Sequence, residues 1–123
     1  MILAKLQLPW PPRDLSPNGR AHWRAKNTAK IAQQRAADAL AREARLHFAQ
    51  VPEGATVRLT AIACPKPRGP YPDDDNLTGS LKGARDAIAA VMKVDDKRFQ
   101  WQPVQKGERC KNGAVIVCVE VAE

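Results

Sequence analysis

The sequence has few cysteines and few aromatic residues, and it contains no long hydrophobic run. Three cysteines occur among 123 residues, and no two of them form a Cys-x-x-Cys pair. An odd number of cysteines without that spacing argues against a disulfide framework and against a structural zinc site. No segment approaches the ~20 consecutive apolar residues of a membrane-spanning helix, so we expect no membrane insertion.

The amino-terminal segment also lacks the pattern of an export signal. MILAKLQLPWPP has no cluster of positive charge ahead of a long apolar core, and Pro9 interrupts its apolar stretch early. A secretory signal peptide needs both features. We therefore expect a cytoplasmic protein, with Cys64 and Cys118 as buried thiols in apolar stretches.

Positive charge is what the chain has in excess. Twenty Lys and Arg residues against 13 Asp and Glu residues give a formal net charge of +7. Such an excess favours a polyanionic partner, although a basic protein without one has the same composition, and charge alone does not separate DNA from RNA. A chain of this length can bury one core, so we predict a single domain spanning residues 1–123.

Hydrophobic periodicity predicts an α/β (α+β) fold with the element order β-α-β-α-β-β. We expect a single four-stranded mixed sheet with two helices packed on it, the last two strands being antiparallel across a short basic turn. Pro103 indicates an edge or a bulge in the third strand, and the nearly continuous apolar run of the fourth indicates cover on both faces. The predicted strands are residues 2–8, 55–64, 99–106 and 114–122, and the predicted helices are residues 21–48 and 76–92.

Three consecutive aspartates, Asp73 to Asp75, follow the proline-rich loop 65–72 and precede the second predicted helix. A helix start stabilises one capping aspartate by ~1 kcal/mol, and we expect Asp75 to be that cap. The other two carboxylates still repel one another. Mg²⁺, an oxygen-seeking cation, is the usual agent that holds such carboxylates together. A Mg²⁺ site and a capped helix with a solvated turn remain equally open at this point.

Two further charged positions bear on that choice. Lys82 lies seven residues beyond Asp75 on the same helix face, where it could stabilise charge on a phosphate or pair with Asp86 four residues on. The spacing favours the ion pair. Asp95 and Asp96 follow the helix, which is roughly 16 residues long and would separate its ends by ~24 Å. They reach the helix start only if the chain doubles back or a second subunit contributes.

In combination, these motifs resemble the RusA-type Holliday junction resolvases. PDDDNL, KGARDAI and VDDK occur in the order of that family, and LQLPWPPRDLSPN is similar to its first strand and proline loop. The resemblance implies a small, basic, homodimeric endonuclease, common in prophages, that depends on Mg²⁺ or Mn²⁺. Its substrate would be branched DNA, a four-way junction of recombination and repair, resolved by paired phosphodiester hydrolysis.

The resemblance also implies roles for individual residues. Asp73, Asp75 and Asp96 match the family's metal-binding catalytic carboxylates, and Lys82 matches its catalytic lysine through the spacing to Asp86. Two positions depart from the pattern, because Gly79 stands where the lysine usually lies and Pro72 stands where a basic residue often precedes the first aspartate. The basic residues expected to contact DNA phosphates are Arg20, Arg24, Lys66, Arg68, Lys97 and Arg98.

Other interpretations remain. The chain could be a catalytically inactive prophage nucleic-acid-binding protein of the same fold, with a structural acidic cluster, or a basic scaffold without preference for branched DNA. Gly79 and Gly83 fit either core packing or a subunit interface. For Trp10, Trp23 and Trp101, the usual burial of tryptophan favours the core over a base-stacking role.

Overall fold

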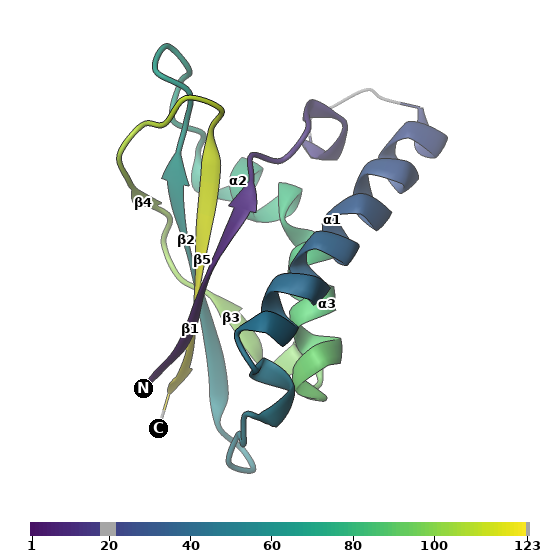
Figure 1. Cartoon of the computed structure of the whole chain (residues 1–123), viewed down its shortest axis with the longest axis vertical. Coiled ribbons are helices and arrows are strands. Elements are labelled where there is room, and N and C mark those ends of the chain that lie inside the picture. The colour runs from purple at the N-terminus through teal and green to yellow at the C-terminus, as the bar shows by residue number, and fades with distance from the viewer. Residues whose placement is uncertain (18–21, 123) are drawn as a thin grey trace.

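Five strands form one mixed sheet in the part of the chain that the structure describes, and three α-helices lie on one of its faces (Figure 1). The structure is a computed structural model, and it describes residues 1–17 and 22–122. The mixed α+β class is as predicted, but within these described residues the sheet has five strands rather than four, and there are three α-helices rather than two.

The sheet order is β1-β5-β2-β3, with β4 pairing farther along β2. β5 runs antiparallel to both of its neighbours, whereas β3 and β4 run parallel to β2. The predicted antiparallel hairpin between the last two strands is therefore wrong. β5 carries the longest run of buried valines and takes a central position between β1 and β2. The strand bounds are β1 Ile2–Pro9, β2 Thr56–Cys64, β3 Phe99–Trp101, β4 Gln105–Lys106 and β5 Ala114–Ala122.

The strand predicted at 99–106 is divided into β3 and β4 around Pro103. Proline has no backbone N–H to donate to a sheet neighbour. The Gln102 N–H still donates to the Leu59 carbonyl at 2.8 Å, but the Val104 N–H turns away and donates to the Asp74 carboxylate at 3.1 Å. The hydrogen bond from Val104 to Asp74 thus connects the edge of the sheet to the acidic cluster.

The α-helices are α1 Trp23–Glu43, α2 Asp74–Ser80 and α3 Lys82–Met92. In the part of the chain that the structure describes, three short 3₁₀ helices accompany them: η1 Arg13–Leu15, η2 Leu46–Phe48 and η3 Asp96–Arg98. The first predicted helix ends earlier than residue 48, because Arg45 adopts the left-handed conformation with φ 62°. That conformation stops an α-helix in the way a C-terminal cap does.

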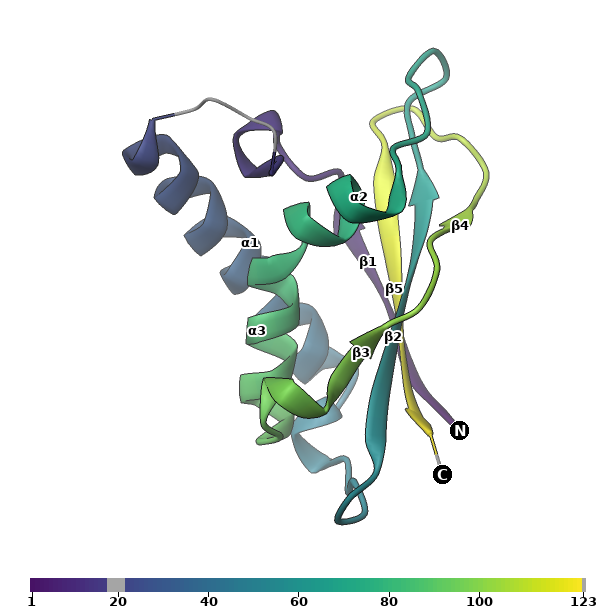
Figure 2. The same ribbon diagram turned by 180° about the vertical axis from the view of Figure 1, so that it is seen from behind.

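The second predicted helix is broken at Leu81 into α2 and α3, which Figure 2 shows at an angle to one another. Thr78 and Ser80 both donate their hydroxyls to the carbonyl four residues earlier, a contact that bends helices. Gln33 of α1 then satisfies the groups left free, because it donates to the Ser80 carbonyl and accepts from the Ala84 N–H.

Gly83 belongs to the same joint. A Cβ at this position would lie 2.9 Å from the Gln33 Oε1 atom and 3.2 Å from Lys30 Cγ. The side chain of residue 83 must therefore be absent for α1 and α3 to pack. Gly79 is equally constrained, since its Cβ would lie 2.4 Å from Cγ of Pro17. Both glycines thus serve packing within one chain, which was one of the two alternatives.

The hydrophobic core fills the space between the sheet and the helices. Valines of β2 and β5, together with Leu59 of β2, meet Ile88 of α3 and Ala37 and Ala41 of α1, all buried. The opposite face of β5 is only half-buried, because Cys118 and Glu120 alternate with the buried valines. The expectation that β5 is covered on both faces for most of its length is therefore wrong. None of the helices in the described residues has the length and apolar character to cross a membrane.

Candidate functional site

The acidic cluster forms the start of α2, and the structure assigns a different task to each aspartate. Asp73 is the N-cap, and its Oδ1 accepts a hydrogen bond from the Asn76 N–H at 2.8 Å. The cap was expected at Asp75, which instead lies in the first turn and is exposed. Asp74 accepts from the Val104 N–H, so α2 is joined to the segment between β3 and β4.

Two basic loops lie beside this helix start and are fastened to one another. Arg109, in the loop 106–113, donates from Nη1 to two backbone carbonyls of the loop 65–72, one of them at 3.0 Å. The Tyr71 hydroxyl donates back to a carbonyl of the other loop at 2.7 Å. Lys106 and Arg109 also lie over the Tyr71 ring, 5.2 and 4.7 Å from its centroid. The loop that leads into Asp73 is thereby held in place, with two cations against its Tyr71 ring.

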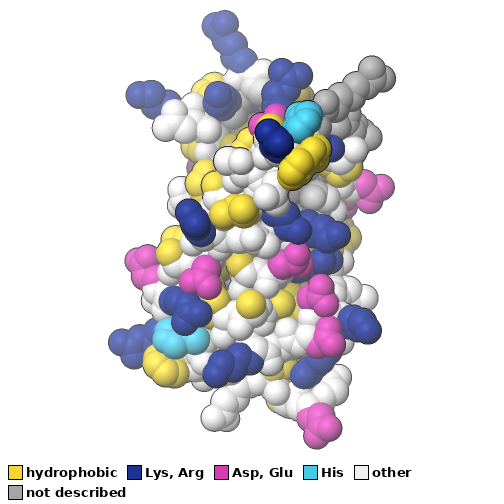
Figure 3. Space-filling view, turned by 90° about the vertical axis from the view of Figure 1, so that its right-hand side faces the viewer, with side chains coloured by type: hydrophobic (Ala, Val, Ile, Leu, Met, Phe, Trp, Pro, Cys, Tyr) yellow, Lys and Arg dark blue, Asp and Glu magenta, His cyan; other side chains and the backbone are white. Residues whose placement is uncertain are grey.

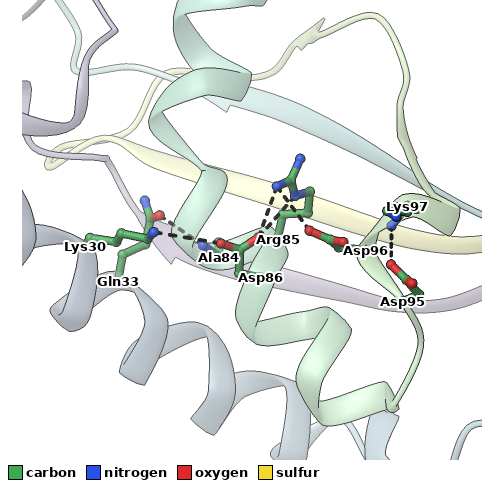
Figure 4. A network of polar contacts seen from close by, with 8 residues as sticks. All are labelled: Lys30, Gln33, Ala84, Arg85, Asp86, Asp95, Asp96 and Lys97. Atoms are coloured by element: carbon green, nitrogen blue, oxygen red, sulfur yellow. Dashed lines mark hydrogen bonds and ion pairs between the residues drawn. The ribbon is translucent and has the colours of Figure 1, made fainter.

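The second acidic pair lies in the turn after α3. Asp95 caps η3, because its Oδ1 accepts from the Lys97 N–H at 2.9 Å, and this hydrogen bond is the main cause that lowers the pKa of Asp95 from 3.8. Asp96 faces α3, where its Oδ2 lies 3.6 Å from Nη2 of Arg85. Figure 4 shows Arg85 between Asp86 and Asp96, with Asp95 farther along the turn. The chain after α3 therefore turns back along this helix, and Asp96 reaches the side chain of Arg85 in its first half.

The carboxylates of Asp73, Asp75 and Asp96 do not form one metal-binding group here. Among residues 1–17 and 22–122, no three His, Cys, Asp or Glu side chains gather as a possible ligand set. Asp73 and Asp75 are exposed carboxylates on one helical turn, and Mg²⁺ often binds one or two carboxylates with water and phosphate oxygens. These two residues fit such a site in their chemistry, whereas Asp96 is engaged with Arg85.

Lys82 begins α3 and lines a cleft on the side that faces α1. Lys26 and Lys30 of α1 line the same cleft. Asp86 forms ion pairs with Arg85 at 3.1 Å and with Lys30 at 4.0 Å. Among the described residues, the predicted ion pair between Lys82 and Asp86 is therefore replaced by these two. Lys82 is exposed and lines the cleft.

The residues expected to contact DNA differ in their surroundings. The side chains of Arg24, Lys66, Arg68 and Lys97 are exposed. Arg98 is half-buried and donates three hydrogen bonds to the Pro52 and Ala55 carbonyls, so it anchors η3 to the turn before β2. Arg20 lies outside the described residues.

The cleft that Lys82 lines was not expected from the sequence, and one of its residues was expected elsewhere. Trp23 was expected in the core, but 65% of its surface is exposed. Trp10 and Trp101 do pack against the core. A signal for the cleft existed, because Trp23 opens the first helix and basic residues recur along the next two turns.

The comparison with known proteins gives one informative similarity. A protein of Xylella fastidiosa (strain Temecula1), described as an uncharacterized protein, is 34% identical over 117 residues. The match covers 95% of this chain and 76% of that protein. No family model matches the chain.

Proposed function

The chain belongs to the same family as this Xylella fastidiosa protein, and we propose that it is a Mg²⁺-dependent, structure-selective DNA endonuclease of the RusA type. Its substrate would be a four-way junction, resolved by paired phosphodiester hydrolysis. The observation that carries the proposal is the acidic start of α2, where Asp73 and Asp75 are exposed beside two fastened basic loops. A phosphodiester attracted by the loops would meet the carboxylates.

Asp73 and Asp75 are the residues that would hold Mg²⁺. The bound ion would supply Lewis-acid activation of a phosphate oxygen and of a water molecule. The hydrogen bond from Asn76 to Asp73 orients the first carboxylate, and the contact between Asp74 and the Val104 N–H keeps α2 against the sheet edge. Lys66 and Arg68, both exposed, would contact the DNA phosphates. Such contacts position the protein on the DNA but do not distinguish one base sequence from another.

Lys82 and Asp96 lie in surroundings that differ from what their implied roles, catalytic lysine and third metal ligand, would require. Lys82 would act on a phosphate that enters the cleft, alongside Lys26 and Lys30. Asp96 would join the metal site only after it leaves Arg85. Paired nicks need two active sites on one junction, so the proposal includes a homodimer in solution.

One observation favours a second candidate function. The engagement of Asp96 by Arg85, together with the lack of a three-carboxylate set in the described residues, fits a nucleic-acid-binding protein of the same fold without catalysis. Such a protein would bind junctions through its basic loops and leave them intact.

Cleavage of a labelled four-way junction with and without Mg²⁺ or Mn²⁺ separates the two. We expect metal-dependent paired nicks by the wild-type protein, loss of nicking in Asp75→Asn, and retained nicking in Asp38→Asn. Asp38 is the matched control because it lies on α1 and pairs with Arg42. Junction binding without nicking by the wild-type protein would support the second candidate and contradict the first.

A further inference from the structure

A cleft of about 550 Å³ lies between η1, the first turns of α1 and the joint of α2 with α3. Its volume falls in the range of pockets that hold small organic molecules. The proposed hydrolysis uses this cleft only through Lys82, and it assigns no role to the aromatic side chain there. Its polar and aromatic lining consists of Asp14, Ser16, Trp23, Lys26, Asn27, Lys30, Ser80 and Lys82.

The charge of the cleft is positive. Lys26 and Lys30 enter from α1 and Lys82 enters from the start of α3, against the single carboxylate of Asp14. Lys30 exposes 42% of its side chain and lies 4.0 Å from Asp86, at the long limit of an ion pair. Three lysine side chains from two helices thus line one hollow, and the ammonium group of Lys30 is directed toward Asp86 at its edge. This arrangement suits a phosphate or another polyanion.

Figure 3 looks onto the side of the molecule where α1 lies. Lys and Arg side chains are spread over the whole of this face, whereas Asp and Glu side chains lie mostly in its lower half. The basic side chains in the upper half therefore have fewer acidic neighbours than those in the lower half.

Trp23 adds an aromatic surface to the positive charge. It is 65% exposed at the first position of α1, and it lines the cleft. The Arg24 guanidinium lies 5.4 Å from its ring centroid and the His22 ring lies 5.8 Å away, so a cation and a second ring are close. A large exposed indole in a basic cleft is the arrangement on which bases of single-stranded nucleic acids stack.

The walls of the cleft are set by close packing. A Cβ at Gly79 would lie 2.4 Å from the ring of Pro17. A Cβ at Gly83 would likewise be too close to the side chains of Lys30 and Gln33. The hollow is thus held by rigid contacts between η1, α1 and the α2–α3 joint. A preformed cleft loses less conformational entropy on binding than one that must be assembled.

We propose that this cleft binds an unpaired nucleotide of DNA. The base stacks on Trp23, and the neighbouring phosphates contact Lys26 and Lys30. The inference rests on the proposed function for the choice of DNA, but it requires no cleavage. Unpaired nucleotides occur in single strands and at the crossover of an opened junction, so the cleft would favour both over continuous duplex.

The test is fluorescence anisotropy with a labelled oligothymidylate of about ten nucleotides, a length within the range of single-strand sites. A duplex of equal length serves for comparison, and EDTA removes divalent cations. We expect Trp23→Ala to weaken single-strand binding about tenfold, as loss of one stacked base does. Trp23→Phe, which keeps a ring, should stay close to wild type, and duplex binding should not change.

Two further variants complete the design. Phe48→Ala removes another exposed aromatic side chain, one that is 69% exposed in η2 and does not line the cleft, and it should leave binding unchanged. Lys26→Gln should reduce the slope of log affinity against log salt by about 0.7, the value for one lost phosphate contact on a single strand. Thermal melts verify that each variant is folded.

The inference is overturned if the wild-type protein does not bind the single strand, if Trp23→Ala weakens duplex binding equally, or if Phe48→Ala has the same effect. Tighter binding of the corresponding RNA would overturn the assignment to DNA. Because all measurements exclude divalent cations, a failure of the proposed nuclease activity leaves this result intact. Junction cleavage with an unchanged affinity of Trp23→Ala would overturn only the inference.

Discussion

The Asp96 carboxylate lies 3.6 Å from the guanidinium of Arg85, and this ion pair keeps the third expected metal ligand on α3. Arg85 also contacts Asp86 at 3.1 Å, so one cation neutralises two carboxylates. If Mg²⁺ draws Asp96 toward the start of α2, it competes with Arg85. The energetics of the metal site then depend on a residue that does not bind the metal.

Arg85→Met should therefore strengthen Mg²⁺ binding. The competing pair is partly exposed, with 25% and 48% of the two side chains accessible, and such pairs are worth about 0.2–1 kcal/mol. Its removal should lower the dissociation constant by roughly up to fivefold, measured by titration calorimetry. Arg42→Met, which removes the pair with Asp38, is the matched control. Unchanged affinity in Arg85→Met would show that Asp96 does not reach the ion.

Asp73 has two tasks, and two substitutions separate them. Asp73→Ala removes the cap on the Asn76 N–H and should lower the free energy of unfolding by about 1 kcal/mol. Asp73→Asn keeps an oxygen that accepts this hydrogen bond, so its stability should stay near wild type while Mg²⁺ affinity falls. Chemical denaturation and metal titration of both variants check this. Equal Mg²⁺ affinity in wild type and Asp73→Asn would remove Asp73 from the metal site.

Gly79→Ala should destabilise the protein, although alanine is the better helix former. Its Cβ would lie 2.4 Å from Cγ of Pro17, and a proline ring has little freedom to move aside. We expect a loss of about 1–3 kcal/mol, as for other overpacked sites, from denaturant unfolding. Gly69→Ala is the control, because its Cβ would meet only ordinary contacts from 3.5 Å outward. A more stable Gly79→Ala would contradict the observed approach of Pro17 to α2.

The capping carboxyl of Asp95 should make stability sensitive to acid. The hydrogen bond from the Lys97 N–H lowers its pKa below 3.8 in the folded state. A lowered carboxyl pKa contributes stability that is complete above the unfolded value and is lost as the pH falls through the folded value. Asp95→Asn lacks this contribution at every pH, so the variant should be less stable than wild type at neutral pH, and the difference should shrink as the pH falls below 3.8. Unfolding curves between about pH 2 and 5 measure it.

Local patterns in the sequence were sufficient for several elements. Alternating and continuous apolar residues located β1, β2 and β5 to within a residue or two, and helical periodicity located α1 and the region of α2 and α3. The aspartate cluster was correctly placed at a helix start. These features depend on neighbours in the chain, so a sequence pattern is enough to indicate them.

The tertiary structure decided which segments meet. β5 pairs with β1 and β2 rather than with the strand before it, and Arg85 rather than the start of α2 holds Asp96. The exposure of Trp23 and the convergence of Lys82 with Lys26 depend on how α1 crosses the α2–α3 joint, where Gln33 satisfies backbone groups of both helices. Contacts between distant residues result from the packing of the whole chain, and no local periodicity encodes them.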